Sequence, residues 1–302
     1  MPPSPRRYSQ PSPSSVELLP GTQAGRPAPL CNNIDIMTTP IVTLTTDFGL
    51  SDHFVGVMKG VILSICPRAQ VVDISHGVTP FEVSEGAYLV AQAYRYFPKK
   101  SVHVVVVDPG VGTSRRPILV EAAGQYFVGP DNGALSLVYS QEKSKVRLIA
   151  GERAGERYFL QPVSRTFHGR DVFSPVAAHL AAGVPPSKMG KPIEDYLRPT
   201  FEKPQRAGKR TWVGRILKID RFGNIVTNFH VNEFPDLGRK DFSLSIGPMQ
   251  IGVLAHNYAE CGPGELFLIC GSTGYLEVSV SQGSAAKQIG CEMGAPAELT
   301  IG

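Results

Sequence analysis

The segment VHVVVVDPGVGTSRRPILV, residues 102–120, joins an apolar run to a charged turn. Its first six residues are almost all valine, which is typical of a strand covered on both faces. The run ends at Asp108, and a proline and a glycine then favour a turn. Arg115 and Arg116 follow before the chain resumes as PILV. A carboxylate and two fixed positive charges at the end of a buried strand raise the question of which other segments reach the same place.

The chain around this segment alternates between strands and helices. IVTLTT (41–46) and VVDIS (71–75) read as strands that precede the valine run 102–107. A helix is expected over FVGVMKGVILSIC (54–66), with Ser51 as its cap. A second, amphipathic helix is expected between residues 83 and 97, and Ser174-Pro175 is expected to open a later one. This order predicts right-handed crossovers and a mainly parallel sheet.

The pattern changes after residue 210 to short strands separated by Gly, Asn and Asp turns, among them WVGRILKI (212–219) and YLEVSV (275–280). The predicted fold class is therefore α/β: an N-terminal, mainly parallel sheet with flanking helices plus a smaller C-terminal all-β, barrel-like domain. We predict the following divisions of the chain: a disordered tail over 1–38, an α/β domain over 39–198, a linker over 199–210 and a β domain over 211–302. Met37 stands directly before the first strand as an alternative start.

Composition excludes several classes of protein. With 42% hydrophobic and 19% charged residues, the chain has the balance of a globular protein. No apolar run approaches the roughly 20 residues that cross a bilayer, so no membrane partner is expected. The formal charge of +4 comes from scattered basic residues, which argues against nucleic-acid binding. The five cysteines form no CxxC motif and no metal-ligand spacing with histidine, which predicts no metal site and a reducing cytoplasm.

Polar residues follow several predicted strands at the point where each strand ends. Asp47 follows the first strand, His76 follows the second, Asp108 follows the third, and Asp131 and Asn132 follow YFVG (126–129). Ligands of open parallel sheets lie beyond the carboxyl ends of the strands, so these side chains are expected to meet. Familiar motifs do not explain them. The DFG at 47–49 lacks the other kinase motifs, and the glycines after Asp108 lead into a strand rather than a phosphate-binding helix.

Five motifs give a more specific signal, in this order: TTDFGLSD, DPGVGTSRR, TFHGRDVFSP, IDRFGNIVTN and GSTGYLEV. Together they resemble the S-adenosyl-L-methionine (SAM) hydroxide adenosyltransferase family, which is related to the fluorinating and chlorinating enzymes. The resemblance covers roughly residues 40–302. It implies an α/β domain joined to a β-barrel, and a homotrimer that binds SAM between the first domain of one subunit and the second domain of its neighbour.

The resemblance also assigns a catalytic set, which falls here on Asp108, Arg115 and His168. The fluorinase has Tyr at the position of Asp108 and Tyr-Ser where this chain has His168-Gly169, so the match is to the water-using branch. The implied reaction is attack of water on C5′ of the ribose, giving adenosine and L-methionine, with SAM as substrate and no cofactor. We expect His168 and Asp108 to hold and deprotonate the water while Arg115 fixes the carboxylate, with His168 as the better proton acceptor and Asp108 as the orienting group. The sequence leaves open which of the two takes the proton. The alternative for Asp108 is a turn carboxylate with Arg115 as its solvated partner.

The remaining site residues are implied by the same resemblance. Asp47 matches the residue that binds the ribose 2′- and 3′-hydroxyls. Asp220, Asn224 and Ser272 match residues at the methionine end, and Phe81 and Tyr258 match aromatic residues beside the nucleoside. Each has a plain structural alternative, because Asp and Asn favour turns and aromatic residues are often core.

Two other functions stay open at this point. One is a halide-using adenosyltransferase on the same fold, which would form a chlorinated nucleoside. The other is a nucleoside- or SAM-binding module without turnover.

Overall fold

The valine run forms β3 (Val102–Val106), a strand buried along its whole length at the centre of a sheet. The chain is seen in a computed structural model that describes residues 39–149, 156–199 and 203–302. The predicted tail, 1–38, lies outside the described residues. Among the described residues the sheet has six strands in the order β2-β1-β3-β5-β4-β6. The other strands are β1 (Ile41–Thr46), β2 (Gln70–Ser75), β4 (Pro117–Ala122), β5 (Gln125–Pro130) and β6 (Ser144–Leu148).

Strands β2, β1, β3 and β5 run parallel, and β4 is antiparallel to both β5 and β6. The carboxyl ends of the parallel strands therefore share one edge, as the sequence predicts. Because β4 begins at Pro117, which pairs with Pro130 at the end of β5, the charged turn 108–116 returns to this same edge.

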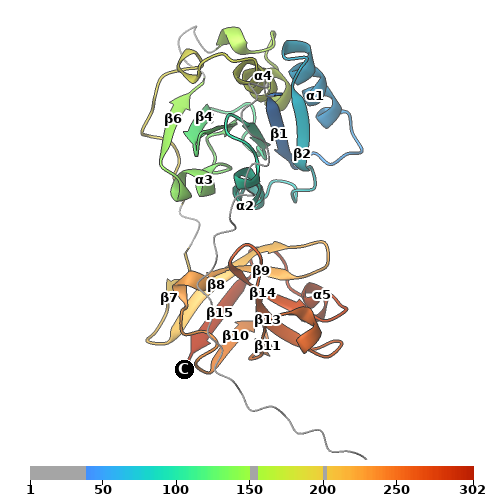
Figure 1. The fold of residues 1–302 in the computed structure, drawn as a ribbon, viewed down its shortest axis with the longest axis vertical. Helices are drawn as coiled ribbons and strands as arrows, with labels where there is room; N and C mark the ends of the chain where they lie inside the picture. Colours follow the sequence, from blue (N-terminus) through green and yellow to red (C-terminus); the bar gives the residue numbers. More distant parts are fainter. Residues whose placement is uncertain (1–38, 150–155, 200–202) are drawn as a thin grey trace, which may run out of the picture. The chain divides into compact units, whose positions relative to one another are not determined.

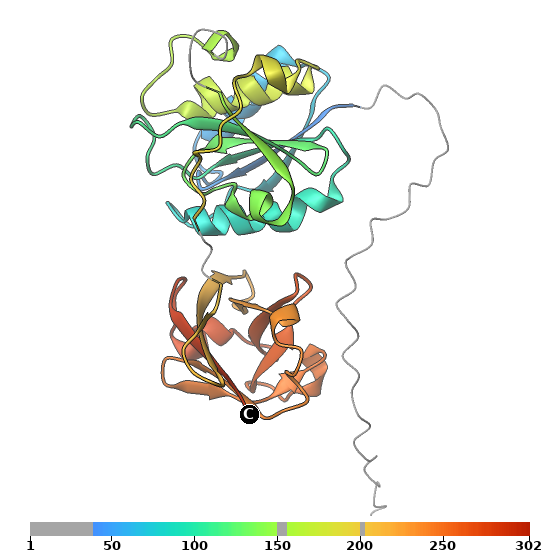
Figure 2. The same cartoon turned by 90° about the vertical axis from the view of Figure 1, so that its left-hand side faces the viewer.

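Helices cover both faces of the sheet (Figures 1 and 2). On one face α1 (Phe54–Ile65) packs against α4 (Ser174–Ala181), and on the other α2 (Val83–Ala93) packs against α3 (Ser136–Gln141). The predicted helix start at Ser174-Pro175 is confirmed. The predicted Ser51 cap is wrong: residues 51–53 form bends, α1 begins at Phe54, and its N-cap residue His53 makes no side-chain capping hydrogen bond.

A π-helical turn, η3 (Gly169–Phe173), runs directly into α4. Such turns are rare and occur often at functional sites. The sequence gives no sign of this turn. The described 3₁₀ turns are η1 (Tyr94–Tyr96), η2 (Glu156–Tyr158), η4 (Pro186–Lys188), η5 (Val231–Glu233) and η6 (Tyr258–Glu260).

The residues from Pro204 onward form a second unit, separate from the unit that ends at Lys203. It is a single curled sheet in the order β11-β10-β15-β8-β9-β14-β13-β12, with β7 paired to β8. Its elements are β7 (Gln205–Arg206), β8 (Thr211–Ile219), β9 (Ile225–His230), β10 (Phe242–Ile246), β11 (Met249–Ile251), β12 (Leu254–Ala255), β13 (Leu266–Cys270), β14 (Tyr275–Val280), α5 (Ala285–Ile289) and β15 (Pro296–Ile301). The predicted fold class is confirmed. Across the described residues, no helix has the length and apolar character that a membrane span requires.

His103 is the one polar residue within β3 and is completely buried. Its ring stacks on Phe127 at 4.8 Å between centroids, and its Nδ1 lies 2.8 Å from the hydroxyl of Thr43. Burial lowers the pKa of His103 to about 3. The unfolded chain, with an ordinary pKa near 6.5, therefore takes up this proton first as the pH falls.

We predict that His103 makes the protein less stable as the pH falls from about 6.5 towards 3, by up to roughly 1.4 kcal/mol per pH unit. A His103→Gln variant, which cannot titrate, is expected to show a shallower loss of unfolding free energy between pH 6 and pH 4.5. Urea unfolding of both proteins at several pH values measures the difference. Equal slopes would contradict the prediction.

Candidate active site

A pocket of about 320 Å³ opens where the carboxyl ends of β1 and β3 meet. Four of the predicted site residues line it: Asp47, Phe81, Asp108 and His168. They come from four separate segments. The strand ends predict Asp47 and Asp108, whereas the family resemblance selects Phe81 and His168. Arg115 stands behind the pocket wall and contacts two of these residues.

Asp108 and Arg115 form a buried ion pair, with side chains only 5% and 9% exposed. Arg115 Nε donates to both carboxylate oxygens of Asp108, at 2.8 and 2.9 Å, and Nη2 donates to Oδ2 as well. The guanidinium also lies over the ring of Phe173, 5.2 Å from its centroid. The alternative of a turn carboxylate with Arg115 as its solvated partner does not fit this burial of the Arg115 side chain.

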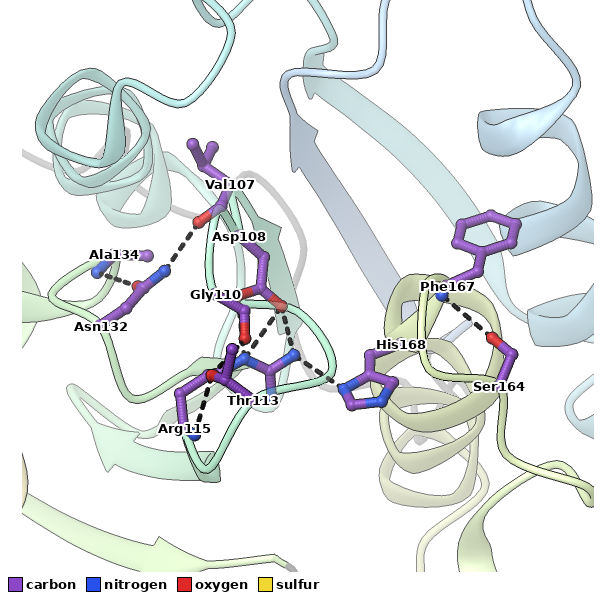
Figure 3. A network of polar contacts seen from close by, with 10 residues as sticks. All are labelled: Val107, Asp108, Gly110, Thr113, Arg115, Asn132, Ala134, Ser164, Phe167 and His168. Atoms are coloured by element: carbon purple, nitrogen blue, oxygen red, sulfur yellow. Dashed lines mark hydrogen bonds and ion pairs between the residues drawn. The ribbon is translucent and has the colours of Figure 1, made fainter.

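The same guanidinium reaches His168. Arg115 Nη2 lies 2.8 Å from Nδ1 of the imidazole, so one side chain joins the acid to the histidine (Figure 3). Burial first, and then the neighbouring charge of Arg115, lower the pKa of His168, and Asp108 only partly offsets them. The imidazole is therefore neutral at neutral pH.

Local hydrogen bonds fix the turn that carries the ion pair. The side-chain amide of Asn132 donates to the carbonyl of Val107 at 2.9 Å, directly before Asp108. The Thr113 hydroxyl donates to the carbonyl of Gly110 at 2.7 Å and accepts from the backbone N–H of Arg115 at 3.3 Å (Figure 3). These bonds shape the turn so that Arg115 folds back onto Asp108.

A glycine brings this turn against the segment that carries His168. Gly112 has a φ of +77°, and a Cβ there would collide with the backbone carbonyl of Arg165. Only glycine accepts both the conformation and the close approach. The backbone contact therefore sets the spacing between the segments of Arg115 and His168.

Hydrogen bonds and an ion pair also hold the segment that carries His168. The hydroxyl of Ser164 accepts from the Phe167 N–H at 3.0 Å, and the fully buried carboxylate of Asp171 accepts from the Ser164 N–H at 2.8 Å. Asp171 also pairs with Arg170 at 2.6 Å. Because His168 lies between Phe167 and the π-helical turn, these bonds limit where its ring can lie.

Aromatic side chains that the sequence analysis does not assign form one wall of the pocket. Phe48, Phe54 and Phe167 lie with ring centroids 5.2 to 5.9 Å apart. Two of them stand inside quoted motifs, Phe48 after Asp47 and Phe167 before His168. Their position next to Asp47 and His168, two candidate site residues, is the sequence signal that could have identified them as pocket residues.

Asp47 links two of the loops at the pocket. Its Oδ2 accepts a hydrogen bond from the backbone N–H of Phe81 at 3.0 Å. Phe81 has a φ of +71° and its side chain is 70% exposed, so it is not a core residue. A bulky residue in this backbone region is unusual and occurs mostly at functional sites.

Four further predicted residues lie in the second unit. Asp220 and Asn224 lie together in the turn between β8 and β9: the carboxylate accepts from the Asn224 side chain and from the backbone N–H groups of Phe222 and Asn224, at 2.8 to 2.9 Å. These are the turn contacts that the structural alternative describes. Contact of either residue with a ligand stays a prediction.

Tyr258 and Ser272 are exposed residues of the second unit. Tyr258 is 46% exposed and touches Phe267 edge-on, and Ser272 lies in the turn between β13 and β14. Next to Ser272, a Cβ on Gly271 would collide with the carboxylate of Glu277. Burial, and then the charge of Asp220, raise the pKa of Glu277. The sequence analysis does not select Glu277 as a polar residue beside this turn. The sequence marks it only as a charged residue inside the strand YLEVSV.

Comparison with known protein families gives two matches that together cover most of the chain. The SAM hydroxide adenosyltransferase N-terminal domain matches residues 42–190. The SAM hydroxide adenosyltransferase C-terminal domain matches residues 214–298.

Curated proteins similar to this chain carry two kinds of name. An (R)-S-adenosyl-L-methionine hydrolase of Salinispora tropica is 38% identical over 87% of this chain and 99% of its own length. A Thermus thermophilus protein of the same name is 35% identical over 85% of this chain and 98% of its own. A fluorinase of Nocardia brasiliensis is more distant, at 28% identity over 87% of this chain and 97% of its own.

Solved structures agree with the fold. An uncharacterized conserved protein from Thermotoga maritima matches with a TM-score of 0.77 and 35% identity, over 86% of this chain and 99% of its own. A conserved hypothetical protein from Thermus thermophilus matches with a TM-score of 0.68 and 30% identity, over 87% of this chain and 100% of its own.

Proposed function

The chain belongs to the SAM hydroxide adenosyltransferase family, and we infer that it is a hydrolase that splits S-adenosyl-L-methionine into adenosine and L-methionine. The reaction takes place at the pocket that contains Asp108 and His168. One observation supports this site above the others: the Arg115 guanidinium contacts both the carboxylate and the imidazole at the pocket wall.

The leaving group of this reaction needs no activation by the protein. The C5′ carbon of SAM is bonded to a sulfonium, so methionine leaves as a neutral thioether when water attacks. The bond electrons pass to sulfur, and the new C5′–O bond forms on the opposite side. The reaction therefore needs no cofactor, and the protein contributes by placing a water molecule in line with the breaking bond.

The contact between Arg115 and His168 assigns the protons of the imidazole. A guanidinium can only donate, so Nδ1 must accept, and the one proton of the neutral ring is on Nε2. A second proton would have to sit on Nδ1, facing the guanidinium. We therefore assign His168 as the neutral acceptor that orients Arg115, in place of the proton-accepting role expected from the sequence.

The proton released by the attacking water then passes to Asp108. The carboxylate lines the pocket and is held in place by Arg115. The oxygen that has just bonded to C5′ carries a positive charge, so it loses its proton readily to the carboxylate. Solvent takes the proton from Asp108 afterwards.

The substrate contacts complete this assignment. Asp47 accepts hydrogen bonds from the ribose hydroxyls. The aromatic wall of Phe48, Phe54 and Phe167 lies, together with Phe81, against the nucleoside. In the second unit, Asp220 binds the methionine ammonium while Asn224 and Ser272 bind its carboxylate, and Tyr258 lies beside the nucleoside. This second set acts from a neighbouring subunit in a homotrimer.

Exposed apolar side chains support the trimer. Phe81, which lines the pocket, is 70% exposed, and Phe222 of the 220–224 turn is 77% exposed. Large exposed apolar side chains beside a site are typical of a surface that another chain covers. We also place the protein in the cytoplasm, because the four cysteines of the described chain are free thiols.

The reaction is tested by incubating SAM with the protein in ¹⁸O-labelled water that contains chloride. We expect adenosine that carries the label in its 5′-hydroxyl, because water attacks at carbon. A chlorinated nucleoside would indicate a halide transferase, and bound SAM without any nucleoside product would indicate a binding module. Mass spectrometry of the products distinguishes the three results.

The role of His168 is tested by two substitutions. In His168→Asn the amide oxygen takes the place of Nδ1 and accepts from Arg115, whereas His168→Ala removes this acceptor. We expect His168→Asn to retain activity within roughly tenfold of wild type and His168→Ala to lose a hundredfold or more. If both variants lose activity equally, His168 takes the proton itself, since an amide cannot.

The shared site is tested by mixing two inactive variants, Asp108→Asn and Asp220→Ala. If each site combines residues from two neighbouring subunits, random trimers made by co-expression restore about a quarter of the wild-type sites. Each variant expressed alone serves as the control. No restored activity in confirmed mixed trimers would mean that both residues act within one chain.

A further inference from the structure

A buried histidine outside the pocket contacts the turn that carries Asp47. His76 is 5% exposed and does not line the pocket. Its Nδ1 lies 2.8 Å from the hydroxyl of Thr46, which also accepts the backbone N–H of Phe48 at 3.3 Å. The imidazole therefore contacts Thr46, the residue before Asp47. Through the Thr46 hydroxyl it is also connected to Phe48, the residue after Asp47.

The backbone of His76 fixes the other end of the same turn. Its carbonyl accepts the Gly49 N–H at 2.8 Å, and the carbonyl of Thr46 accepts the Val78 N–H at 3.3 Å. Side chain and backbone of one residue thus contact both ends of the 46–49 turn. Asp47 lies between these two points of attachment.

Asp73 completes the arrangement on the far side of the ring. Its Oδ1 lies 3.0 Å from Nε2 of His76, and its Oδ2 accepts from Lys59 at 2.6 Å. Burial opposes ionisation of Asp73, but the hydrogen bonds from Lys59 and His76 together lower its pKa. Asp73 thus faces one ring nitrogen of His76 while the Thr46 hydroxyl contacts the other, so both edges of the buried ring have a polar neighbour.

We propose that His76, oriented by Asp73, is a positioning residue that fixes Asp47 for the ribose hydroxyls of the substrate. The proposal rests on the proposed function, because it takes Asp47 as the ribose contact. The carboxylate of Asp47 also accepts the Phe81 N–H, so its direction is set from the 46–49 turn on one side and the 79–82 loop on the other. Loss of His76 removes the first of these constraints.

The test compares SAM with its 2′-deoxy analogue. In the wild type we expect kcat/KM for the analogue to be roughly tenfold lower or worse, because the charged carboxylate of Asp47 loses one of its two hydroxyl partners. In His76→Phe, which keeps the ring but cannot bond Thr46, this preference should fall at least fivefold. Asp73→Asn should lower it at least twofold.

A matched control is His179→Gln, a half-buried histidine of the same unit whose ring contacts Tyr158 at 5.0 Å. This variant should keep the wild-type preference. A preference that stays unchanged in a folded His76→Phe overturns the inference, and if that variant does not fold, the partly exposed Asp73→Asn decides. A wild type that hydrolyses SAM but does not distinguish the analogue also overturns it. A wild type that releases no adenosine overturns the proposed function instead.

Discussion

The ion pair between Asp108 and Arg115 is the interaction on which the site depends. Both side chains are almost fully buried, and replacing such a pair by apolar residues is often neutral or even stabilising. Stability alone therefore does not account for it. Removal of one partner leaves a buried charge, at a cost of about 3–5 kcal/mol. The pair also fixes Arg115 in the position from which it reaches His168, 53 residues further along the chain.

The fold makes this meeting possible by supplying two rigid segments. Parallel strands bring the turn 108–116 to the same edge as Asp47, and the π-helical turn before α4 brings the segment of His168 there. The contact between Gly112 and Arg165 then sets their separation, and Asp171 restrains the second segment from inside. Each of these constraints acts on backbone, so the fold itself positions the side chains at the pocket.

The sequence predicts the parts of the site that follow strands. Asp47 and Asp108 directly follow apolar runs, and parallel pairing makes the ends of those runs neighbours. His168 follows no strand, and only the family resemblance selects it. The contacts of Arg115 with His168 and of His76 with Thr46 depend on side-chain orientation across 53 and 30 residues. Local patterns carry no such information. The Ser51 cap fails for a local reason, because residues 51–53 form bends and α1 begins only at Phe54.

The charge of the pocket bears on the choice of nucleophile. Among the described residues that line it, Asp47 and Asp108 are carboxylates and there is no lysine or arginine, because Arg115 lies behind Asp108. A neutral His168 adds no positive charge. Such a pocket favours a cationic sulfonium and disfavours an approaching anion, whereas water pays no electrostatic penalty. The family resemblance implies an uncharged tyrosine in the fluorinase at the position of Asp108, so the two kinds of enzyme differ in charge at this point.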